Sequence, residues 1–361
     1  MIGGCTRQPP TPIPQQTLRI GTQNTAEAST VFREILSAEP LLVLDWHGRA
    51  VPRLAEAWEW LDGGLRLSVR LRQDVKFQDG TPMTARAASE ILRRNIAKGT
   101  SEGFRHLAGI ETPDERRLVF RLRQPDSFLV EAIAAAFVAD YDRPSLRTGP
   151  FKLVPTASGL TAERNTAYYR GTPDIARVEV SFYDTQRAVF AAIIRGAIDV
   201  APEVNPESVE FLQGASAVET FSSVRPFYVP LVFNLRHPIL RHPGVRRALS
   251  EAIDREEIVR QAMRGHARIA DDPIWPAHWA YTAASRRHAH DPDAARARLD
   301  AAGFPLRPAG PDAMASRFQL HCLFYNRDFQ FERIAVLLQR QLEEVGVDLV
   351  LTGVDQETLI R

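Results

Sequence analysis

Few residues of this chain have the types and spacing that catalysis or metal binding requires. The sequence contains no G-x-S-x-G nucleophile elbow, P-loop, dinucleotide-binding fingerprint or H-E-x-x-H helix. Two pairs of histidines lie close in sequence: His237 with His242, and His288 with His290. Both pairs lie in polar loops without the helical spacing of metal ligands, which favours surface histidines. No two carboxylates are placed as a general acid and base. The residues therefore predict no catalytic group, no metal site and no cofactor.

The polar segment Thr22, Gln23 and Asn24 is the first candidate for noncovalent binding. It follows residues 17–21, which are typical of a short strand that ends at a glycine. Its hydroxyl and amide groups can both donate and accept hydrogen bonds. The segment is therefore predicted to be a loop at the edge of a ligand site. Ordinary turn polarity would give the same pattern and is the alternative.

A second candidate lies between a strand predicted at residues 318–325 and a helix that Asp328 can cap. Arg327 stands at this junction, and its guanidinium can hold a carboxylate through two parallel hydrogen bonds. An arginine at a strand-to-helix corner can point into a cleft. We interpret Arg327 as a candidate ligand-binding residue, with Tyr325 and Asn326 as companions. A solvated loop arginine is the alternative.

Composition places the chain among ordinary globular proteins. Its 361 residues carry 45 Lys and Arg against 44 Asp and Glu, with 44% hydrophobic and 25% charged residues. Such a balance indicates neither a basic nucleic-acid binder nor a disordered tail. The two cysteines, Cys5 and Cys322, are too far apart in sequence to suggest a redox pair or a zinc cluster. No stretch approaches the roughly 20 apolar residues of a membrane-spanning helix.

The amino terminus has an unusual pattern. Residues 1–5, Met-Ile-Gly-Gly-Cys, resemble the end of a bacterial lipoprotein signal, in which the cysteine is acylated. The basic and apolar parts of such a signal are missing, so a chance match or a start further upstream are both open. Residues 6–16 contain four prolines and suit a tether. Cys5 is therefore a candidate lipidation site, and residues 1–16 are interpreted as a signal remnant and tether.

The binding candidates depend on alternating strands and helices for their positions. Residues 65–72 and 118–122 alternate between apolar and polar side chains, as half-buried strands do. Further strands are predicted at residues 151–154, 160–164, 177–182, 198–201, 227–234 and 347–351, and helices after Thr84, at 128–139, 185–195 and 291–303, and after Pro243, Asp254 and Asp328. Strand, helix and strand follow one another twice with short joints, which indicates crossover units. The sequence predicts an α/β body of two lobes with an inserted subdomain.

Four segments resemble one known family. They are residues 52–59 leading into the L-R-x-x-V-K-F-x-D-G run at 71–80, the T-G-P-F segment at 148–151, residues 244–249 with 252–255, and residues 291–303. In order and spacing they cover nearly the whole chain and look like family 5 of the extracytoplasmic solute-binding proteins. These proteins serve ABC importers of dipeptides, oligopeptides and nickel.

The resemblance implies a two-lobed periplasmic-binding-protein fold of type II, the Venus flytrap, with an inserted β-rich subdomain. It assigns residues 17–42 and 144–230 to lobe I, 43–143 to the insertion, and 231–361 to lobe II. Family members usually continue well past the strand at 347–351, with a loop whose aspartate holds the ligand amine. The chain is therefore expected to be C-terminally truncated, with an incomplete second lobe.

The resemblance also implies a function. The chain is expected to capture a peptide between its lobes and present it to an ABC permease, without enzymatic activity. Arg327 matches the position from which dipeptide binders offer an arginine to the ligand carboxylate, and Thr22 to Asn24 match the loop that lines the cleft. We expect a monomer in the periplasm or at the outer face of the cell membrane, without nucleic acid and with membrane contact only through a lipid on Cys5.

Two alternatives stay open. Residues 105–107 and 353–355 look somewhat like the nickel branch of the family, so a nickel chelate is a rival ligand. The same fold also occurs as a ligand-sensing module of regulators and receptors.

Overall fold

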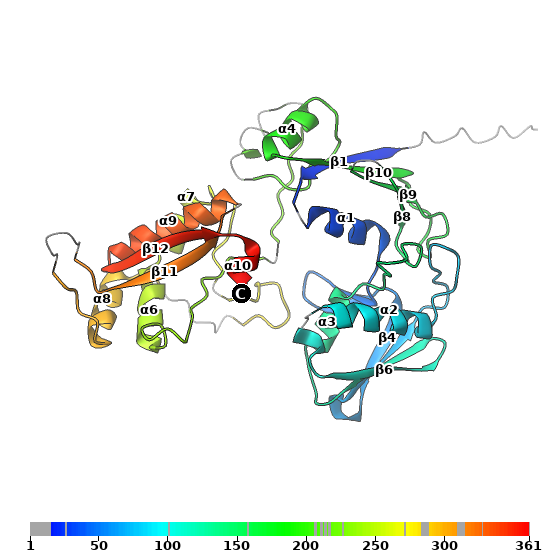
Figure 1. Ribbon diagram of the computed structural model, residues 1–361, viewed down its shortest axis with the longest axis horizontal. Helices are drawn as coiled ribbons and strands as arrows, with labels where there is room; N and C mark the ends of the chain where they lie inside the picture. The colour runs from blue at the N-terminus through cyan, green and yellow to red at the C-terminus, as the bar shows by residue number, and fades with distance from the viewer. Residues whose placement is uncertain are drawn as a thin grey trace, which may run out of the picture. The chain divides into compact units, whose positions relative to one another are not determined.

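The computed structural model describes residues 16–360 except 26, 100–101, 157–158, 206–207, 210–211, 213–214, 216–217, 226, 271, 283–288, 309–314 and 327. The chain forms two compact units (Figure 1). Unit 1 comprises the described residues up to Val204 and within Gln213–Glu219, and unit 2 comprises those within Asn205–Leu212 and from Thr220 onward. The lobe boundaries expected from the resemblance stay predictions.

Unit 1 contains most of the strands. These are β1 (Thr17–Gln23), β2 (Leu42–Leu44), β3 (Ala50–Pro52), β4 (Ala55–Leu61), β5 (Arg66–Leu71), β6 (Leu107–Asp114), β7 (Arg117–Leu122), β8 (Phe151–Val154), β9 (Leu160–Arg164) and β10 (Arg177–Tyr183). Its helices are α1 (Ala28–Ser37), α2 (Ala85–Lys98), α3 (Leu129–Ala135) and α4 (Gln186–Ile194), with 3-10 turns at Asp62–Gly64 and Glu102–Phe104.

The first sheet of unit 1 has the strand order β1-β10-β9-β8. β1 runs parallel to β10 in a register that pairs Thr17 with Arg177 and Gln23 with Tyr183. The helix α1 packs against β8 and β9 (Figure 1). Apolar residues from these elements form the core of this sheet: Leu36, Phe151, Leu160, Ala162, Val178 and Val180.

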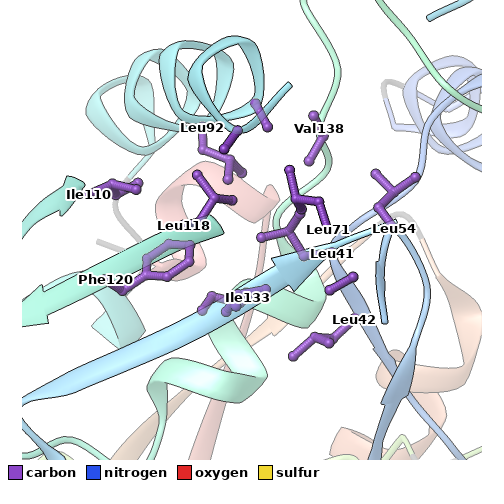
Figure 2. Close-up of a cluster of buried hydrophobic side chains, with 14 of the residues drawn as sticks. Leu41, Leu42, Leu54, Leu71, Leu92, Ile110, Leu118, Phe120, Ile133 and Val138 are labelled. Atoms are coloured by element: carbon purple, nitrogen blue, oxygen red, sulfur yellow. The ribbon is translucent and has the colours of Figure 1, made fainter. Parts of the chain in front are cut away.

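The second sheet of unit 1 has the order β4-β5-β7-β6 and antiparallel pairing throughout. The strands predicted at residues 65–72 and 118–122 are confirmed, and Leu67, Val69 and Leu118 are fully buried. The alternation is less strict than predicted, because Leu65 is 39% exposed whereas Ser68 and Val119 are buried. Figure 2 shows Phe120 and Leu118 of β7 and Leu92 of α2 in one apolar cluster. This sheet with α2 and α3 therefore holds the largest described core of the chain.

Unit 2 contains a two-stranded parallel sheet and most of the remaining helices. Its elements are α6 (Pro243–Ala252), α7 (Arg255–Gln261), α8 (Pro292–Ala301), β11 (Phe318–Tyr325), α9 (Phe329–Glu343), β12 (Val347–Val354) and α10 (Gln356–Ile360). The helices α6, α8 and α9 bury their apolar faces with β11 and β12 in one core. The predicted crossover from β11 through α9 to β12 is confirmed.

The predicted helix starts are confirmed where side chains cap the first turn. Thr84 accepts a hydrogen bond from the Ala87 N–H at 3.3 Å, and Asp291 accepts one from the Ala294 N–H at 2.9 Å. Such caps satisfy backbone donors that a helix leaves unpaired at its start. None of the described helices has the length and hydropathy needed to cross a bilayer.

One predicted helix is shorter in the structure, and one predicted strand is absent. The helix predicted for residues 128–139 ends at Ala135, because Phe137 pairs with Pro40 in an antiparallel bridge. Residues 198–201 form no strand, since only Val200 bridges to Ile20 of β1. In both places a contact with a distant segment overrides the local pattern.

The strand predicted at residues 227–234 is also wrong. The described residues of this run are in no helix or strand, and Phe227 and Val232 are 73% and 81% exposed. Pro230 interrupts the run and offers no backbone donor to a neighbouring strand. Apolar content alone did not distinguish this segment from a paired strand.

A buried carboxylate joins two helices of unit 2. Glu251 of α6 is 6% exposed and accepts hydrogen bonds from Arg298 Nε at 2.9 Å and Arg247 Nε at 3.0 Å. Burial by itself raises the pKa of Glu251, but the bonds from Arg298 and Arg247 outweigh it and hold this pKa below its ordinary value. The carboxylate is therefore most stable when ionised.

The variant Glu251→Gln should lower the free energy of unfolding by about 2 kcal/mol at pH 7, because two arginines lose their charged acceptor. A carboxylate with a lowered folded pKa stabilises the fold fully above its unfolded pKa, about 4.3, and this contribution disappears as the pH falls through the folded pKa. Urea unfolding at pH 7 and pH 3 should show a difference from wild type that shrinks at pH 3. The exposed Glu256→Gln is the control, and a pH-independent difference would contradict the assignment.

Candidate functional site

The unit 1 edge is formed by Thr22, Gln23, Asn24 and Tyr183. Thr22 and Gln23 are the last residues of β1, and Tyr183 is the last residue of the parallel strand β10. The Asn24 N–H donates to the Tyr183 carbonyl oxygen at 2.7 Å, so the chain leaves both strands at the same place. Carboxyl ends of parallel strands lie at one edge of a sheet, where open α/β folds bind ligands.

The prediction that Thr22 and Gln23 lie in a loop is wrong, because β10 continues to Tyr183 and supplies pairing partners for both. Their side chains are half-buried, whereas Asn24 is exposed. Thr22 and Gln23 therefore end β1 and Asn24 follows it, and their role in binding stays a prediction. Sequence reasoning missed Tyr183, and its only signal was an aromatic hydroxyl directly after the strand predicted at residues 177–182.

Close packing fixes the strand that carries this edge. A Cβ atom on Gly21 would lie 2.4 Å from Ile198 Cδ1 and 3.1 Å from Tyr183 Cε2. The Gly21 N–H also donates to the Val200 carbonyl at 2.9 Å. Glycine at this position therefore lets the Tyr183 ring and the segment around Ile198 approach β1 closely.

An ion pair strengthens the same attachment. Arg19 of β1 donates from Nη2 to Asp199 Oδ1 at 2.5 Å and from Nε to Oδ2 at 3.1 Å. A third bond runs from Arg19 Nη1 to the Gly196 carbonyl at 2.8 Å. The hydrogen bond from Arg19 holds the pKa of Asp199 below its usual value. The pair positions the segment after α4 beside β1 rather than binding a ligand.

The unit 2 edge is formed by Tyr325 and Asn326. Tyr325 ends β11, and the Asn326 N–H donates to the Val354 carbonyl at the end of the parallel strand β12, at 3.0 Å. The Tyr325 ring is half-buried and meets Phe331 of α9 edge to face, with 6.2 Å between ring centroids. Asn326 is exposed. This edge repeats in unit 2 the arrangement found in unit 1.

The start of α9 lies next to the unit 2 edge. Asp328 accepts a hydrogen bond from the Gln330 N–H at 2.9 Å, which confirms it as the predicted cap. Arg327, the predicted carboxylate ligand, lies outside the described residues, as does Cys5. Phe329 follows Asp328 and is 78% exposed. It lines a shallow, mostly apolar hollow of about 400 Å³ between α7 and α9, which the sequence did not reveal.

The two edges contain hydroxyl, amide and phenol groups and no nucleophile paired with a base. Over the described part of the chain, no three His, Cys, Asp or Glu side chains cluster as a metal site would require. The arrangement can therefore bind a polar solute through hydrogen bonds.

An α/β chain with such edges has the fold of the two-lobed periplasmic binding proteins. The chain belongs to family 5 of the extracellular solute-binding proteins, since residues 49–360 match the family described as Bacterial extracellular solute-binding proteins, family 5 Middle. The family consists of substrate-binding proteins.

Known relatives illustrate the range of the family. The probable D,D-dipeptide-binding periplasmic protein DdpA of Escherichia coli (strain K12) is 26% identical over 329 residues, which cover 85% of this chain and 61% of that protein. The chain thus spans less than two thirds of that relative's length.

Two solved structures share the fold. The oligopeptide-binding protein AppA of Bacillus subtilis, in complex with a nonapeptide, matches with a TM-score of 0.75 and 22% identity over 96% of this chain and 77% of that chain. NikZ of Campylobacter jejuni, in complex with Ni(L-His), matches with a TM-score of 0.76 and 21% identity over 95% of this chain and 75% of that chain.

Proposed function

We propose that the chain is the substrate-binding component of an ABC importer, which captures a peptide or similar small solute between its two units and presents it to the permease. The observation that carries this proposal is the polar edge of each unit at the carboxyl ends of parallel strands. A dipeptide-binding relative and a relative solved with a nonapeptide support a peptide as the solute.

In this proposal Thr22, Gln23 and Asn24 contact the solute from unit 1, and Tyr325, Asn326 and Arg327 contact it from unit 2. Arg327 supplies the guanidinium that pairs with the solute carboxylate. A ligand that touches both units favours their closed arrangement, which the importer can recognise. Micromolar affinity corresponds to about 8 kcal/mol and requires no covalent step.

Calorimetric titration with a series of di- and tripeptides tests the proposal. Arg327→Gln should weaken binding by about 50-fold because a charge-assisted hydrogen-bonded pair is lost, and Asn24→Ala should weaken it by about 5-fold. The exposed Arg86→Gln removes an equal charge and should leave the affinity unchanged. Unchanged affinity in both site variants, or the absence of binding by any peptide, would reject the proposed site.

A nickel chelate is the second candidate ligand, because NikZ was solved with Ni(L-His) and has the same fold. The same titration with nickel and histidine separates the two candidates. Heat from the chelate without heat from any peptide would replace the peptide assignment. Peptide hydrolysis that Arg327→Ala abolishes would overturn the inference that the chain binds without catalysis.

We infer that the protein works as a monomer in the periplasm or at the outer face of the cell membrane, held there by a lipid on Cys5, with a permease as its partner and without nucleic acid. Relatives that are described as periplasmic support this location. In cells, an alkyne analogue of palmitate should label the wild-type chain and the control Cys322→Ser, but not Cys5→Ser. Labelling of the Cys5 variant, or of none of the three chains, would rule out the anchor.

A further inference from the structure

Arg147 is a buried cation with very few hydrogen-bond partners. Arg147 is 5% exposed and directly precedes the T-G-P-F segment of unit 1. Of its five N–H donors, one is used: Nη1 donates to the Ser37 hydroxyl at 2.7 Å. Nε is buried without a partner. Among the described residues, no carboxylate lies within ion-pair distance of this guanidinium.

Arg317, the other buried arginine among the described residues, has the hydrogen bonds and the ion pair that usually stabilise a buried charge. Arg317 is 6% exposed and donates to the Val345 carbonyl at 2.9 Å and the Phe304 carbonyl at 2.6 Å, and it pairs with Asp300. Burial of a charge is costly unless it is paired and hydrogen-bonded. Arg147 therefore lacks a compensation that Arg317 has.

Nearby acidic groups do not supply that compensation, because they are engaged elsewhere. Asp140 accepts from Arg94 at 3.0 Å and from Arg143 at 2.8 Å. Glu34 accepts the Tyr141 hydroxyl at 2.6 Å. The Tyr141 ring contacts the Arg147 guanidinium, 5.9 Å from the ring centroid, and Tyr141 is itself 44% exposed. The buried guanidinium thus adjoins a side chain that reaches the surface.

The unused donors have a particular geometry. Nη1 is held by Ser37, whose own hydroxyl donates to the Arg33 carbonyl at 2.6 Å, so this bond has a fixed direction. Nε and Nη2 remain, and their N–H groups lie on the side of the guanidinium that can donate two parallel hydrogen bonds to a carboxylate. Burial also lowers the pKa of Arg147, which an adjacent anion would oppose.

We propose that Arg147, positioned by Ser37 and covered by Tyr141, is a binding site for a carboxylate, separate from the unit 1 edge assigned to the imported solute. Ser37 ends α1, whereas the unit 1 edge leads into its beginning, so the helix of 10 residues, about 15 Å long, separates the two places. The carboxylate belongs either to a free small acid or to the carboxyl terminus of a peptide. The proposal does not depend on the proposed transport function.

Thermal unfolding of the full chain in acetate tests the site, with chloride exchanged for acetate at constant ionic strength. A ligand that binds only the folded state raises the midpoint of unfolding in a saturable manner. We expect a rise of about 3 °C at ten times the dissociation constant for the wild type. The response should disappear in Arg147→Gln and persist in Arg33→Gln, which removes a neighbouring exposed arginine of α1.

Two further arms complete the test. Arg147→Lys keeps the charge but loses the two parallel N–H donors of the guanidinium, so it should bind acetate at least tenfold more weakly. This variant replaces Arg147→Gln in the test if Arg147→Gln does not fold. Glycylglycine, measured in wild type and in Arg147→Gln, distinguishes the sources, because a response that the variant keeps belongs to the strand edges. An Arg147-dependent stabilisation at much lower concentration than acetate assigns the site to a peptide terminus, and one equal to that of acetate assigns it to small acids. Glycylglycine amide lacks the carboxylate and should give no Arg147-dependent response. A linear, equal response to acetate in wild type and Arg147→Gln would overturn the proposal.

Discussion

Replacing Phe120 by alanine should lower the free energy of unfolding of unit 1 by about 4 kcal/mol. Phe120 is fully buried on the central strand β7, opposite Leu67 of β5 and Ile110 of β6 (Figure 2). Removal of the ring leaves a cavity that two neighbouring strands cannot close without breaking their ladder. Urea unfolding followed by circular dichroism measures the loss.

Phe128→Ala is the matched control for this substitution. Phe128 is 63% exposed at the start of α3. Its backbone N–H donates to Asp126 Oδ1 at 2.9 Å and its carbonyl accepts from the Ala132 N–H at 3.0 Å, and the substitution keeps both bonds. Its truncation should change the free energy of unfolding by less than about 0.5 kcal/mol. Equal effects of the two variants would show that the β4-β5-β7-β6 sheet is not the main core of unit 1.

The second large effect is expected for Gly149→Ala. A Cβ atom on Gly149 would lie 2.4 Å from the carbonyl carbon of Ser37 and 2.8 Å from the Ala38 nitrogen. Both are backbone atoms, so no side-chain rotation can relieve the contact. The Gly149 N–H also donates to the Ser37 carbonyl at 3.0 Å, and separation of the two chains would break this bond. We expect a loss of about 3 kcal/mol in urea unfolding.

Gly109→Ala separates this clash from the general effect of adding a methyl group. Gly109 lies in β6, and a Cβ atom there meets nothing within 4 Å. We expect this control to change stability by about 0.5 kcal/mol or less. A destabilisation of the same size in both variants would mean that the close approach at Ser37 does not limit the fold.

The sequence predicted the elements whose determinants are local. The strands at β5 and β7 follow from strict alternation, and the starts of α2 and α8 follow from a capping residue, Thr84 or Asp291. It also predicted the strand before Thr22 to Asn24, although this strand continues to Gln23 instead of ending at Gly21. These features depend on residues only a few positions away in the sequence, so the local pattern is sufficient to predict them.

Features that depend on distant partners could not be predicted. The end of α3 is set by Pro40, and the extension of β1 to Gln23 is set by the length of β10. The strand expected at residues 227–234 had the correct composition but has no pairing partner among the described residues. Likewise, the isolation of Arg147 appears only when its surroundings are known, because the sequence does not show that neighbouring acids are already paired.

The pairing of β1 with β10 has a consequence for the order in which the polypeptide matures during synthesis. A ribosome releases Thr17–Gln23 early, yet the partner strand Arg177–Tyr183 emerges only after the whole β4-β5-β7-β6 sheet has been translated. Contacts so remote in sequence form late because the intervening chain must first be closed into a loop. The nascent protein should therefore form the β4-β5-β7-β6 sheet first. Until β10 has been translated, β1 remains unpaired and accessible to chaperones.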